Sequence, residues 1–293
     1  MTRDSRLLAG DRERSEHKWA CILGEPIAHS LSPALHNAAF AALGIDAHYE
    51  ARLVTHEDLA GVVRELRRAD CLGANVTAPH KQAVIPLVDE VGDEVRALGA
   101  LNTIVNLNGR LVAGNTDAAG LARWMRLSGI DPAGRPAVVI GAGGAARSAV
   151  WALADLGANA VVVLNRTVER AQTLVTNLQP HVKSIDLMWG NIAEAAEPAA
   201  RPWRVVINAT SLGHHGGAPE VHPSWYSPGS VAIELAYNPP VTGFMVAAQE
   251  AGARAENGLG MLLHQAALAF ERWTGQAPPM DVYEAVVRER IAA

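Results

Sequence analysis

The stretch over residues 137–167 constrains the fold more than any other part of the chain. A short run rich in Val and Ile ends at Ile140, a glycine-rich turn follows, and an alanine-rich segment without Gly or Pro covers residues 145–156. A second apolar run then occupies residues 160–164. Short β-branched runs on either side of an uninterrupted alanine-rich segment are typical of strand, helix and strand. The sequence therefore predicts a βαβ unit here.

The turn inside this unit matches the dinucleotide-binding pattern G-x-G-x-x-G/A, with Gly141, Gly143 and Ala146 at the three fixed positions. The glycines allow a tight turn and a close approach of the backbone to a pyrophosphate, and the small Ala146 lets helix and strand pack closely. The helix start at Gly144 and Ala145 presents free N–H groups and a partial positive charge. Because the pattern follows a strand and opens a helix, it predicts a dinucleotide site rather than a plain connection.

The end of the second strand indicates which dinucleotide is bound. An NAD site usually has Asp or Glu about 20 residues after the glycines, where it accepts from the ribose 2′-hydroxyl. This chain has Asn165, Arg166 and Thr167 there, with Arg170 one turn later. A guanidinium donates charge-assisted hydrogen bonds to a phosphate, whereas a carboxylate would repel it. The pattern favours NADP over NAD, the alternative being that both arginines are solvated residues at a helix start.

Length, charge and composition narrow the class of protein. With 293 residues the chain can build two domains, and its 49% hydrophobic and 19% charged residues are typical of a globular protein. The net charge of −5, without a basic stripe, argues against nucleic acid as a partner. The 2 cysteines form no C-x-x-C pair and the histidines lack ligand spacing, so we expect neither a disulfide framework nor a metal site.

Charge and hydropathy also bear on where the protein works. Residues 1–17 are rich in charge and are expected to form a disordered, solvated tail. This segment has no apolar signal-peptide core, and no run of about 18 apolar residues occurs anywhere in the sequence. We therefore expect a cytoplasmic protein that does not bind membranes.

Two serines follow the first expected strand at residues 19–24. Ser32 precedes Pro33, a pair typical of the N-cap and first residue of a helix, and Ser30 lies in the loop just before it. Two hydroxyls at a strand-to-helix turn can hold a carboxylated or polyhydroxylated ligand, or can serve only as cap and turn residues. The spacing leaves both interpretations open.

Lysine is rare in this chain, which makes Lys81 informative. Of the 25 Lys and Arg residues only three are lysine, at positions 18, 81 and 183. A strand is expected to end at Thr77 and a helix to begin at Pro79, which places Lys81 in the first turn. The positive end of the helix dipole favours the neutral form of a lysine, and lysine, unlike arginine, can release its proton. We interpret Lys81 as a proton-transfer residue, the alternative being an exposed first-turn lysine.

Three further polar residues stand where elements begin or end, or on an apolar face. Asp117 precedes a helix expected over residues 121–128 and is its N-cap, a site carboxylate, or both. Thr210 ends a buried strand, at the edge where open α/β sheets bind ligands. Gln265 lies on an apolar face of a helix expected over residues 261–274, so its amide needs a backbone partner or a ligand.

The other expected elements complete an α/β pattern. A hairpin turn is expected at Asn108 and Gly109. The remaining strands are expected at residues 47–53, 100–105, 110–114, 204–210 and 231–235, and the remaining helices at 57–68, 168–178, 244–251 and 280–290.

Taken together and in order, these stretches resemble the shikimate dehydrogenase family from about Ala20 to about Ile291. Any one motif alone is weak, but the ordered set is close to diagnostic. The motifs are Gly24-Glu-Pro-Ile-Ala-His-Ser-Leu-Ser-Pro33, Asn75-Val-Thr-Ala-Pro-His-Lys81, Ala100-Leu-Asn-Thr103, Gly114-Asn-Thr-Asp117, Gly141-Ala-Gly-Gly-Ala-Ala-Arg147, Asn165-Arg-Thr167, Asn208-Ala-Thr210, Tyr237-Asn-Pro239 and Asn257-Gly-Leu-Gly-Met-Leu-Leu-His-Gln265.

The resemblance implies an α/β fold with two lobes and the active site between them. An N-terminal mixed-sheet substrate domain is expected over residues 18–117 and 257–293, because the C-terminal helices return to it, and an NADP-binding Rossmann domain over residues 118–256. The implied reaction is the reversible reduction of 3-dehydroshikimate to shikimate with NADPH, in the route to aromatic amino acids. We expect a small-molecule substrate and a monomer or homodimer.

The same resemblance implies roles for individual residues. Lys81 and Asp117 would form the catalytic pair: an ammonium stabilises and protonates the alkoxide left by hydride transfer, the carboxylate orients it, and either group can exchange the proton. The expected substrate-binding residues are Ser30 and Ser32 at the carboxylate and Thr77, Asn102, Tyr237 and Gln265 at the ring. The expected cofactor-binding residues are Gly141, Gly143, Gly144, Ala145, Ala146, Asn165, Arg166, Thr167, Arg170, Thr210 and Gly258.

Two departures from the family pattern leave room for a shifted specificity. His80 stands where an aromatic residue such as Phe is common, and residues 212–215, after the Asn208 to Thr210 strand, also depart from the pattern. The alternatives are a quinate/shikimate or aminoshikimate dehydrogenase and, from a different class, a ligand-binding relative without activity. Ser32 and the Asn165 to Thr167 stretch argue against quinate, and the presence of both Lys81 and Asp117 argues against an inactive relative.

Overall fold

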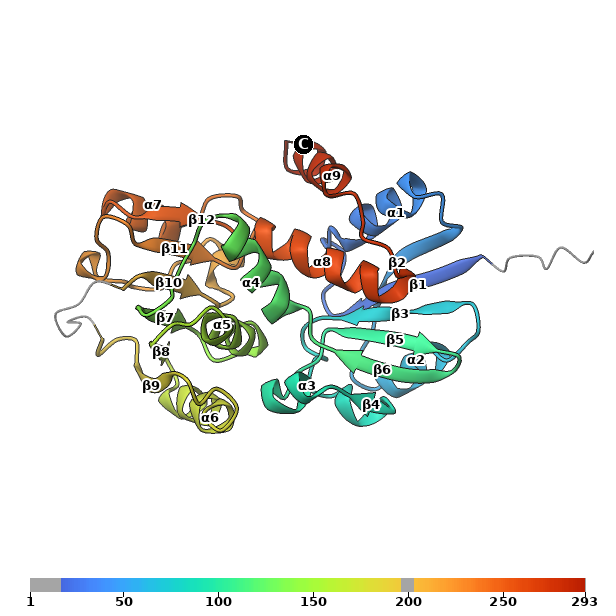
Figure 1. Ribbon diagram of the computed structural model, residues 1–293, viewed down its shortest axis with the longest axis horizontal. Helices are drawn as coiled ribbons and strands as arrows, with labels where there is room; N and C mark the ends of the chain where they lie inside the picture. The colour runs from blue at the N-terminus through green and yellow to red at the C-terminus, as the bar shows by residue number, and fades with distance from the viewer. Residues whose placement is uncertain (1–16, 196–202, 293) are drawn as a thin grey trace, which may run out of the picture.

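The computed structural model describes residues 17–195 and 203–292, so the tail expected over residues 1–17 lies, apart from His17, outside the described residues. The described chain forms two lobes, each built on its own sheet (Figure 1). Two helices cross between the lobes, α4 (Asp117–Leu127) and α8 (Leu259–Thr274), as Figure 1 shows. No helix of the described residues is both long and apolar enough to cross a membrane.

The first lobe contains a mixed sheet with the strand order β2-β1-β3-β5-β6-β4. β1 pairs in parallel with β2 and β3, β5 is antiparallel to both β3 and β6, and β4 pairs in parallel with β6. The turn between β5 and β6 has positive φ at Asn108 (53°) and Gly109 (91°), which a two-residue hairpin turn requires. The strands are β1 (Lys18–Gly24), β2 (Ala47–Leu53), β3 (Cys71–Val76), β4 (Glu90–Val91), β5 (Thr103–Leu107) and β6 (Arg110–Gly114).

Helices cover both faces of this sheet, which therefore lies between two separate hydrophobic cores. On one face, Leu35 and Phe40 of α1 (Ser32–Ala42) pack with Phe270 of α8 and Tyr283 of α9 (Met280–Ala292). On the other face, α2 (Leu59–Glu65), the 3-10 turn η1 (Ile85–Leu87) and α3 (Asp93–Leu98) cover the sheet. The two C-terminal helices therefore return to the first lobe.

The second lobe contains a parallel sheet with the order β12-β11-β10-β7-β8-β9. The predicted βαβ unit is confirmed as β7 (Pro136–Ile140), α5 (Gly144–Asp155) and β8 (Ala160–Asn165). Both faces are covered, which explains the nearly continuous apolar runs of the strands. The other elements are α6 (Val168–Leu178), β9 (Asp186–Asn191), β10 (Val205–Asn208), η2 (Leu212–His215), η3 (Pro223–Trp225), β11 (Val231–Glu234), α7 (Gly243–Glu250) and β12 (Arg254–Glu256).

Two glycines allow the helices that join the lobes to cross closely. A Cβ on Gly120 of α4 would lie 2.6 Å from the backbone nitrogen of Gln265 in α8. A Cβ on Gly260 of α8 would overlap the indole of Trp124 in α4. Any larger side chain at either position would push the crossing apart. The joint between the lobes is thus a tight helix pair.

Several local predictions were wrong. Ser32 is the first residue of α1 rather than its N-cap, which is Leu31, and no side chain caps this helix. Pro79 opens no α-helix, because residues 78–84 form successive turns that lead into η1. Asp117 is already helical, since α4 begins there with Thr116 as its N-cap. The helix expected over residues 57–68 is confined to α2, and α3, β4, β9 and β12 were not predicted.

Candidate active site

Lys81 and Asp117 lie in contact although 36 positions separate them. Lys81 comes from the turn after β3, and Asp117 is the first residue of α4. The lysine Nζ donates to Oδ2 of the carboxylate at 2.5 Å, and the side chains are 21% and 8% exposed. A pair of opposite charges that is largely buried interacts more strongly than a pair on the surface. Lys81 lies in a turn, so the α-helix whose dipole was expected to favour the neutral form of this lysine does not begin at Pro79.

Asn102 holds the second oxygen of the same carboxylate. Its Nδ2 donates to Asp117 Oδ1 at 2.8 Å, and its Oδ1 accepts from the backbone N–H of Thr116 at 2.7 Å. The backbone donor requires the oxygen of the amide on that side, so the NH₂ group faces the carboxylate. Gln265 Oε1 lies 3.5 Å from the same Nδ2. The structure thus joins four of the predicted site residues in one hydrogen-bonded cluster.

A buried polar chain behind Asn102 was not identified from the sequence. The Thr103 hydroxyl donates to Asn102 Oδ1 at 2.9 Å, Asn75 Nδ2 donates to the Thr103 hydroxyl at 3.2 Å, and the Tyr49 hydroxyl donates to Asn75 Oδ1 at 2.7 Å. All of these residues are buried. Asn and Thr inside otherwise apolar strands were the available signal, because buried polar side chains need partners.

The predicted carboxylate-binding serines lie on the turn that opens α1. The Ser30 hydroxyl accepts from the backbone N–H of Ser32 at 3.3 Å, and Ser32 is 4% exposed. Thr77 lies against the end of β1, since a Cβ built on Gly24 would overlap its methyl carbon. The turns after β1 and β3 therefore meet at the same end of the sheet.

Tyr237 reaches this turn from the second lobe. It follows β11 and is half-buried, and burial raises the pKa of its hydroxyl above the ordinary value. A hydrogen bond with the backbone of Leu31 acts on that pKa in the opposite direction. Tyr237 therefore connects the second lobe to the Ser30 to Ser32 turn of the first.

The glycine-rich turn has the geometry that its sequence required. Gly141 has a φ of 112°, and a Cβ there would lie 2.9 Å from the carbonyl oxygen of Ala209. Around Gly143 no atom of the described chain lies within 4 Å of a built Cβ, so the backbone there is open to a ligand. Ala146 is fully buried in the core between α5 and the sheet. A Cβ on Gly144 would lie 3.7 Å from Lys81 Cδ, which places the lysine against the N-terminus of α5.

The arginines expected at the 2′-phosphate follow β8. Arg166 and Arg170 are exposed, and neither guanidinium group has a hydrogen bond or ion pair with another described residue. The Asn165 amide donates to the carbonyl oxygen of Thr167 at 2.8 Å and so shapes the turn. Thr210, at the end of β10, donates its hydroxyl to Asn208 at 2.8 Å. Two guanidinium groups with unused donors are suited to bind a phosphate.

Arg147 forms a contact between the lobes that the sequence did not indicate. It lies in the first turn of α5, is 9% exposed, and donates to the carbonyl oxygen of Leu98 at the end of α3 at 3.2 Å. Burial lowers the pKa of its guanidinium. A cation at a helix C-terminus is favourable, so this contact stabilises the approach of the two lobes.

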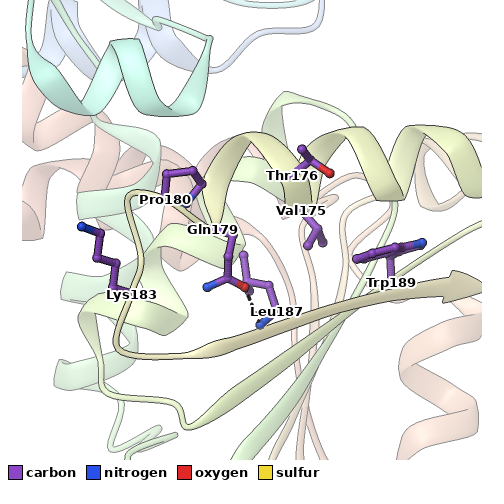
Figure 2. Close-up of a pocket in the computed structure, with 7 residues that line it drawn as sticks. All are labelled: Val175, Thr176, Gln179, Pro180, Lys183, Leu187 and Trp189. Carbon is purple, nitrogen blue, oxygen red and sulfur yellow. Dashed lines mark hydrogen bonds between the residues drawn. The ribbon is translucent and has the colours of Figure 1, made fainter.

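A groove on the outer edge of the second lobe is separate from this cluster. Figure 2 shows it between α6 and β9, with Lys183 at one end and Trp189 at the other. β9 is the edge strand of its sheet, and none of the predicted site residues lines the groove. The cluster between the lobes therefore remains the candidate site.

A parallel dinucleotide-binding sheet beside a mixed sheet that bears a sheltered lysine–carboxylate pair defines a class, the two-lobed dinucleotide-dependent oxidoreductases. Three family profiles match consecutive parts of the chain: the shikimate dehydrogenase substrate binding domain at residues 22–104, shikimate / quinate 5-dehydrogenase at 127–211, and the shikimate 5'-dehydrogenase C-terminal domain at 258–289. The chain belongs to the shikimate dehydrogenase family.

Individual relatives support this assignment over nearly the full length. A shikimate dehydrogenase (NADP(+)) of Moorella thermoacetica is 42% identical over 276 residues, which cover 93% of each chain. A crystal structure of the Thermus thermophilus shikimate 5-dehydrogenase in complex with NADP(H) and shikimate has a TM-score of 0.82 and 36% identity, covering 93% of this chain and 99% of that one. The quinate dehydrogenase of Corynebacterium glutamicum in complex with NAD has a TM-score of 0.85 at 27% identity, covering 93% and 99%.

Proposed function

We propose that this protein catalyses the reversible, NADP-dependent oxidation of shikimate to 3-dehydroshikimate. The observation that carries the proposal is the Lys81–Asp117 contact of 2.5 Å, with Lys81 Cδ placed against Gly144 at the N-terminus of α5. An acid–base pair thus lies directly in front of the turn suited to a dinucleotide. Relatives named as NADP-dependent shikimate dehydrogenases, at 42% and 40% identity, support the choice of substrate and cofactor.

The residues present fit NADP. The turn formed by Gly141, Gly143, Gly144, Ala145 and Ala146, whose backbone is open at Gly143, would hold the pyrophosphate at the N-terminus of α5. The exposed turn with Asn165, Arg166, Thr167 and Arg170 would hold the 2′-phosphate, and Thr210 and Gly258 would flank the nicotinamide end. When bound, the cofactor exchanges the hydride, and the protein supplies placement and electrostatics.

The substrate would lie between the two turns of the first lobe and the Lys81–Asp117 pair. Ser30 and Ser32 are proposed to bind its carboxylate, and Tyr237 approaches the same turn from the second lobe. Thr77, Asn102 and Gln265 are proposed to orient the ring hydroxyls. Holding the ring by several polar groups at once is what brings a reacting carbon into position.

The Lys81–Asp117 pair is proposed to handle the proton. In the direction of reduction, the alkoxide that forms beside Lys81 is stabilised by the ammonium and takes up a proton. Asp117 keeps the lysine in place, and Asn102 in turn fixes the carboxylate at 2.8 Å. In the direction of oxidation, the substrate hydroxyl gives its proton to the same pair.

The division into two domains, the cellular location and the partners are part of the same proposal. We infer that residues 18–117 and 257–293 act as the substrate domain and residues 118–256 as the cofactor domain, consistent with the two sheets. The protein is proposed to act in the cytoplasm on small molecules, as a monomer or homodimer, without nucleic acid or membrane partners.

A steady-state assay of NADP⁺ and NAD⁺ against shikimate and quinate tests the proposal. We expect the highest kcat/KM with shikimate and NADP⁺. Higher kcat/KM with quinate, or with NAD⁺, would contradict the proposed specificity. Absence of turnover with every pair would contradict the enzymatic role itself.

A further inference from the structure

Glu234 is a carboxylate in the interior of the second lobe. It is the last residue of β11, between β10 and β12 in the sheet, and its exposure is 0%. Removing a carboxylate from water is costly unless donors surround it. It lies at the carboxyl end of its strand, close in sequence to Tyr237 and next to the strand that leads to Thr210.

The carboxylate accepts at least three hydrogen bonds from three different segments. Asn208 Nδ2 at the end of β10 donates to Oε2 at 2.7 Å, and the hydroxyl of Thr242, the N-cap of α7, donates to the same oxygen at 3.1 Å. The backbone N–H of Ala236 donates to Oε1 at 3.1 Å. One side chain thus connects the ends of two strands and the start of a helix.

The hydrogen bond from Asn208 to Glu234 fixes the turn that carries Thr210, a proposed cofactor-binding residue. Because Glu234 binds the NH₂ group of Asn208, the amide oxygen must face the other way, where it accepts from the Thr210 backbone N–H at 3.1 Å and from the Thr210 hydroxyl at 2.8 Å. The same turn rests on the glycine-rich turn, since the Ala209 carbonyl oxygen lies 2.9 Å from a Cβ on Gly141.

The hydrogen bond from the backbone N–H of Ala236 to Glu234 fixes the turn that carries Tyr237, a proposed substrate-binding residue. Ala236 precedes Tyr237, whose hydroxyl lies near the backbone of Leu31, beside the two serines. The carbonyl oxygen of Ala236 accepts from the backbone N–H of Gly258 at 3.1 Å, at the start of α8. The turn that bears Tyr237 is therefore fixed from both sides.

We propose that Glu234 is a positioning residue that sets the placement of Thr210 relative to Tyr237, and through them the alignment of the nicotinamide against the substrate. This inference rests on the proposed function. Its structural basis is that one carboxylate holds both turns. Oε2 accepts from Asn208, which orients Thr210, and Oε1 accepts from the backbone N–H of Ala236, which precedes Tyr237.

The polarity of these bonds provides a sharp test. Glu234→Gln replaces one acceptor oxygen by an NH₂ group, which must then face either the Ala236 N–H or the Asn208 NH₂, both donors. Asn208→Asp places a second carboxylate against the first. In the double variant the glutamine NH₂ donates to Asp at position 208, its oxygen accepts from Ala236, and the other carboxylate oxygen still accepts from Thr210.

The experiment measures kcat for shikimate oxidation, the Kd of NADP⁺ by fluorescence, and the melting temperature for the two single variants and the double variant. We expect each single variant to lose at least about tenfold in kcat while the Kd of NADP⁺ changes less than about threefold, because the phosphate contacts lie elsewhere. The double variant should recover kcat to within about threefold of wild type. Glu250→Gln, an exposed carboxylate at the end of α7, is the matched control and should leave all three quantities unchanged.

Three outcomes would overturn the inference. Single variants with wild-type kcat would show that alignment does not depend on Glu234. A double variant that regains the wild-type melting temperature without regaining kcat would assign Glu234 a purely structural role. A wild-type protein that turns over neither shikimate nor quinate would overturn the proposed function and this inference with it, whereas an active wild-type protein with unaffected variants would overturn the inference alone.

Discussion

The two lobes prepare their parts of the site by different means. In the first lobe, side chains hold one another: Lys81 and Asn102 both donate to Asp117, and Asn102 in turn accepts from the backbone N–H of Thr116. In the second lobe the surface offered to a ligand is mainly backbone, at the glycine-rich turn, together with exposed arginines. Chemistry requires side chains with a fixed orientation, whereas phosphate binding requires N–H groups and positive charge. Changes at the Lys81–Asp117 cluster should therefore affect kcat, and changes at the glycine-rich turn or at the exposed arginines should affect cofactor binding.

The largest expected effect is that of Lys81→Ala on kcat. Loss of the ammonium removes both the proton donor and the charge that stabilises the alkoxide, so we expect kcat to fall by about 10²-fold or more. The Kd of NADP⁺ should change little, because the lysine belongs to the first lobe. Lys183→Ala, at an exposed lysine in the second lobe, is the control and should behave as wild type. An unchanged kcat in Lys81→Ala would end the proposed role of this residue.

The joint between the lobes is tested by Gly260→Ala. The new Cβ would overlap the Trp124 indole in a tightly packed crossing, so we expect the free energy of unfolding to fall by about 2–3 kcal/mol. Gly61→Ala in α2 is the matched control, since a Cβ there meets no described atom within 4 Å, and it should be neutral or stabilising by up to about 1 kcal/mol. Urea denaturation measures both, and equal stabilities would show that the crossing is looser than the structure indicates.

The first lobe should also be the more acid-sensitive of the two. Burial lowers the pKa of His36 to about 3, and its Nε2 has no hydrogen-bond partner. The unfolded chain therefore binds one more proton than the folded chain between pH 6.5 and about 3, and stability falls as the pH drops through this range. At pH 5 the loss from His36 is about 2 kcal/mol.

Replacing this histidine should remove that part of the acid sensitivity. In His36→Gln, which does not titrate but can still bond to the Tyr283 hydroxyl, we expect the fall in melting temperature between pH 7 and pH 5 to be smaller than in wild type. His56→Gln, at an exposed histidine, should keep the wild-type pH dependence. Parallel pH curves for wild type and His36→Gln would contradict the assignment.

The smallest expected effect is that of Arg166→Ala on the KM for NADP⁺, which tests the proposed phosphate contact in the second lobe. Arg166→Ala should raise the KM for NADP⁺ about tenfold by removing one charge-assisted hydrogen bond, and should leave kcat and the KM for NAD⁺ nearly unchanged. Arg135→Ala is the control, because this exposed arginine precedes β7 at the opposite end of the strand from the glycine turn. An equal rise in KM for both dinucleotides would contradict a contact with the 2′-phosphate.

Most of the second lobe could be predicted from the sequence, and less of the first. The βαβ unit and α6 were predicted nearly to the residue because continuous apolar strands alternate there with segments that have helical periodicity and no Gly or Pro in their interiors. In the first lobe, the local structure at Ser32, Lys81 and Asp117 was predicted wrongly, because serine, proline and aspartate signals were interpreted as helix caps and helix starts. Short elements such as β4 and β12 follow from strand pairing and carry little local pattern.

The sequence by itself determined those features whose residues lie close together along the chain. The glycine turn, the small residue at 146 and the arginines after β8 occupy about 30 consecutive positions, and each acts through local backbone geometry or its own charge. Only the tertiary structure decided how distant groups meet: Lys81 with Asp117, Arg147 with Leu98, and Glu234 with Asn208. A hydrogen bond depends on distances of a few tenths of an ångström, and these are set by the packing of whole helices and sheets, which no local pattern specifies.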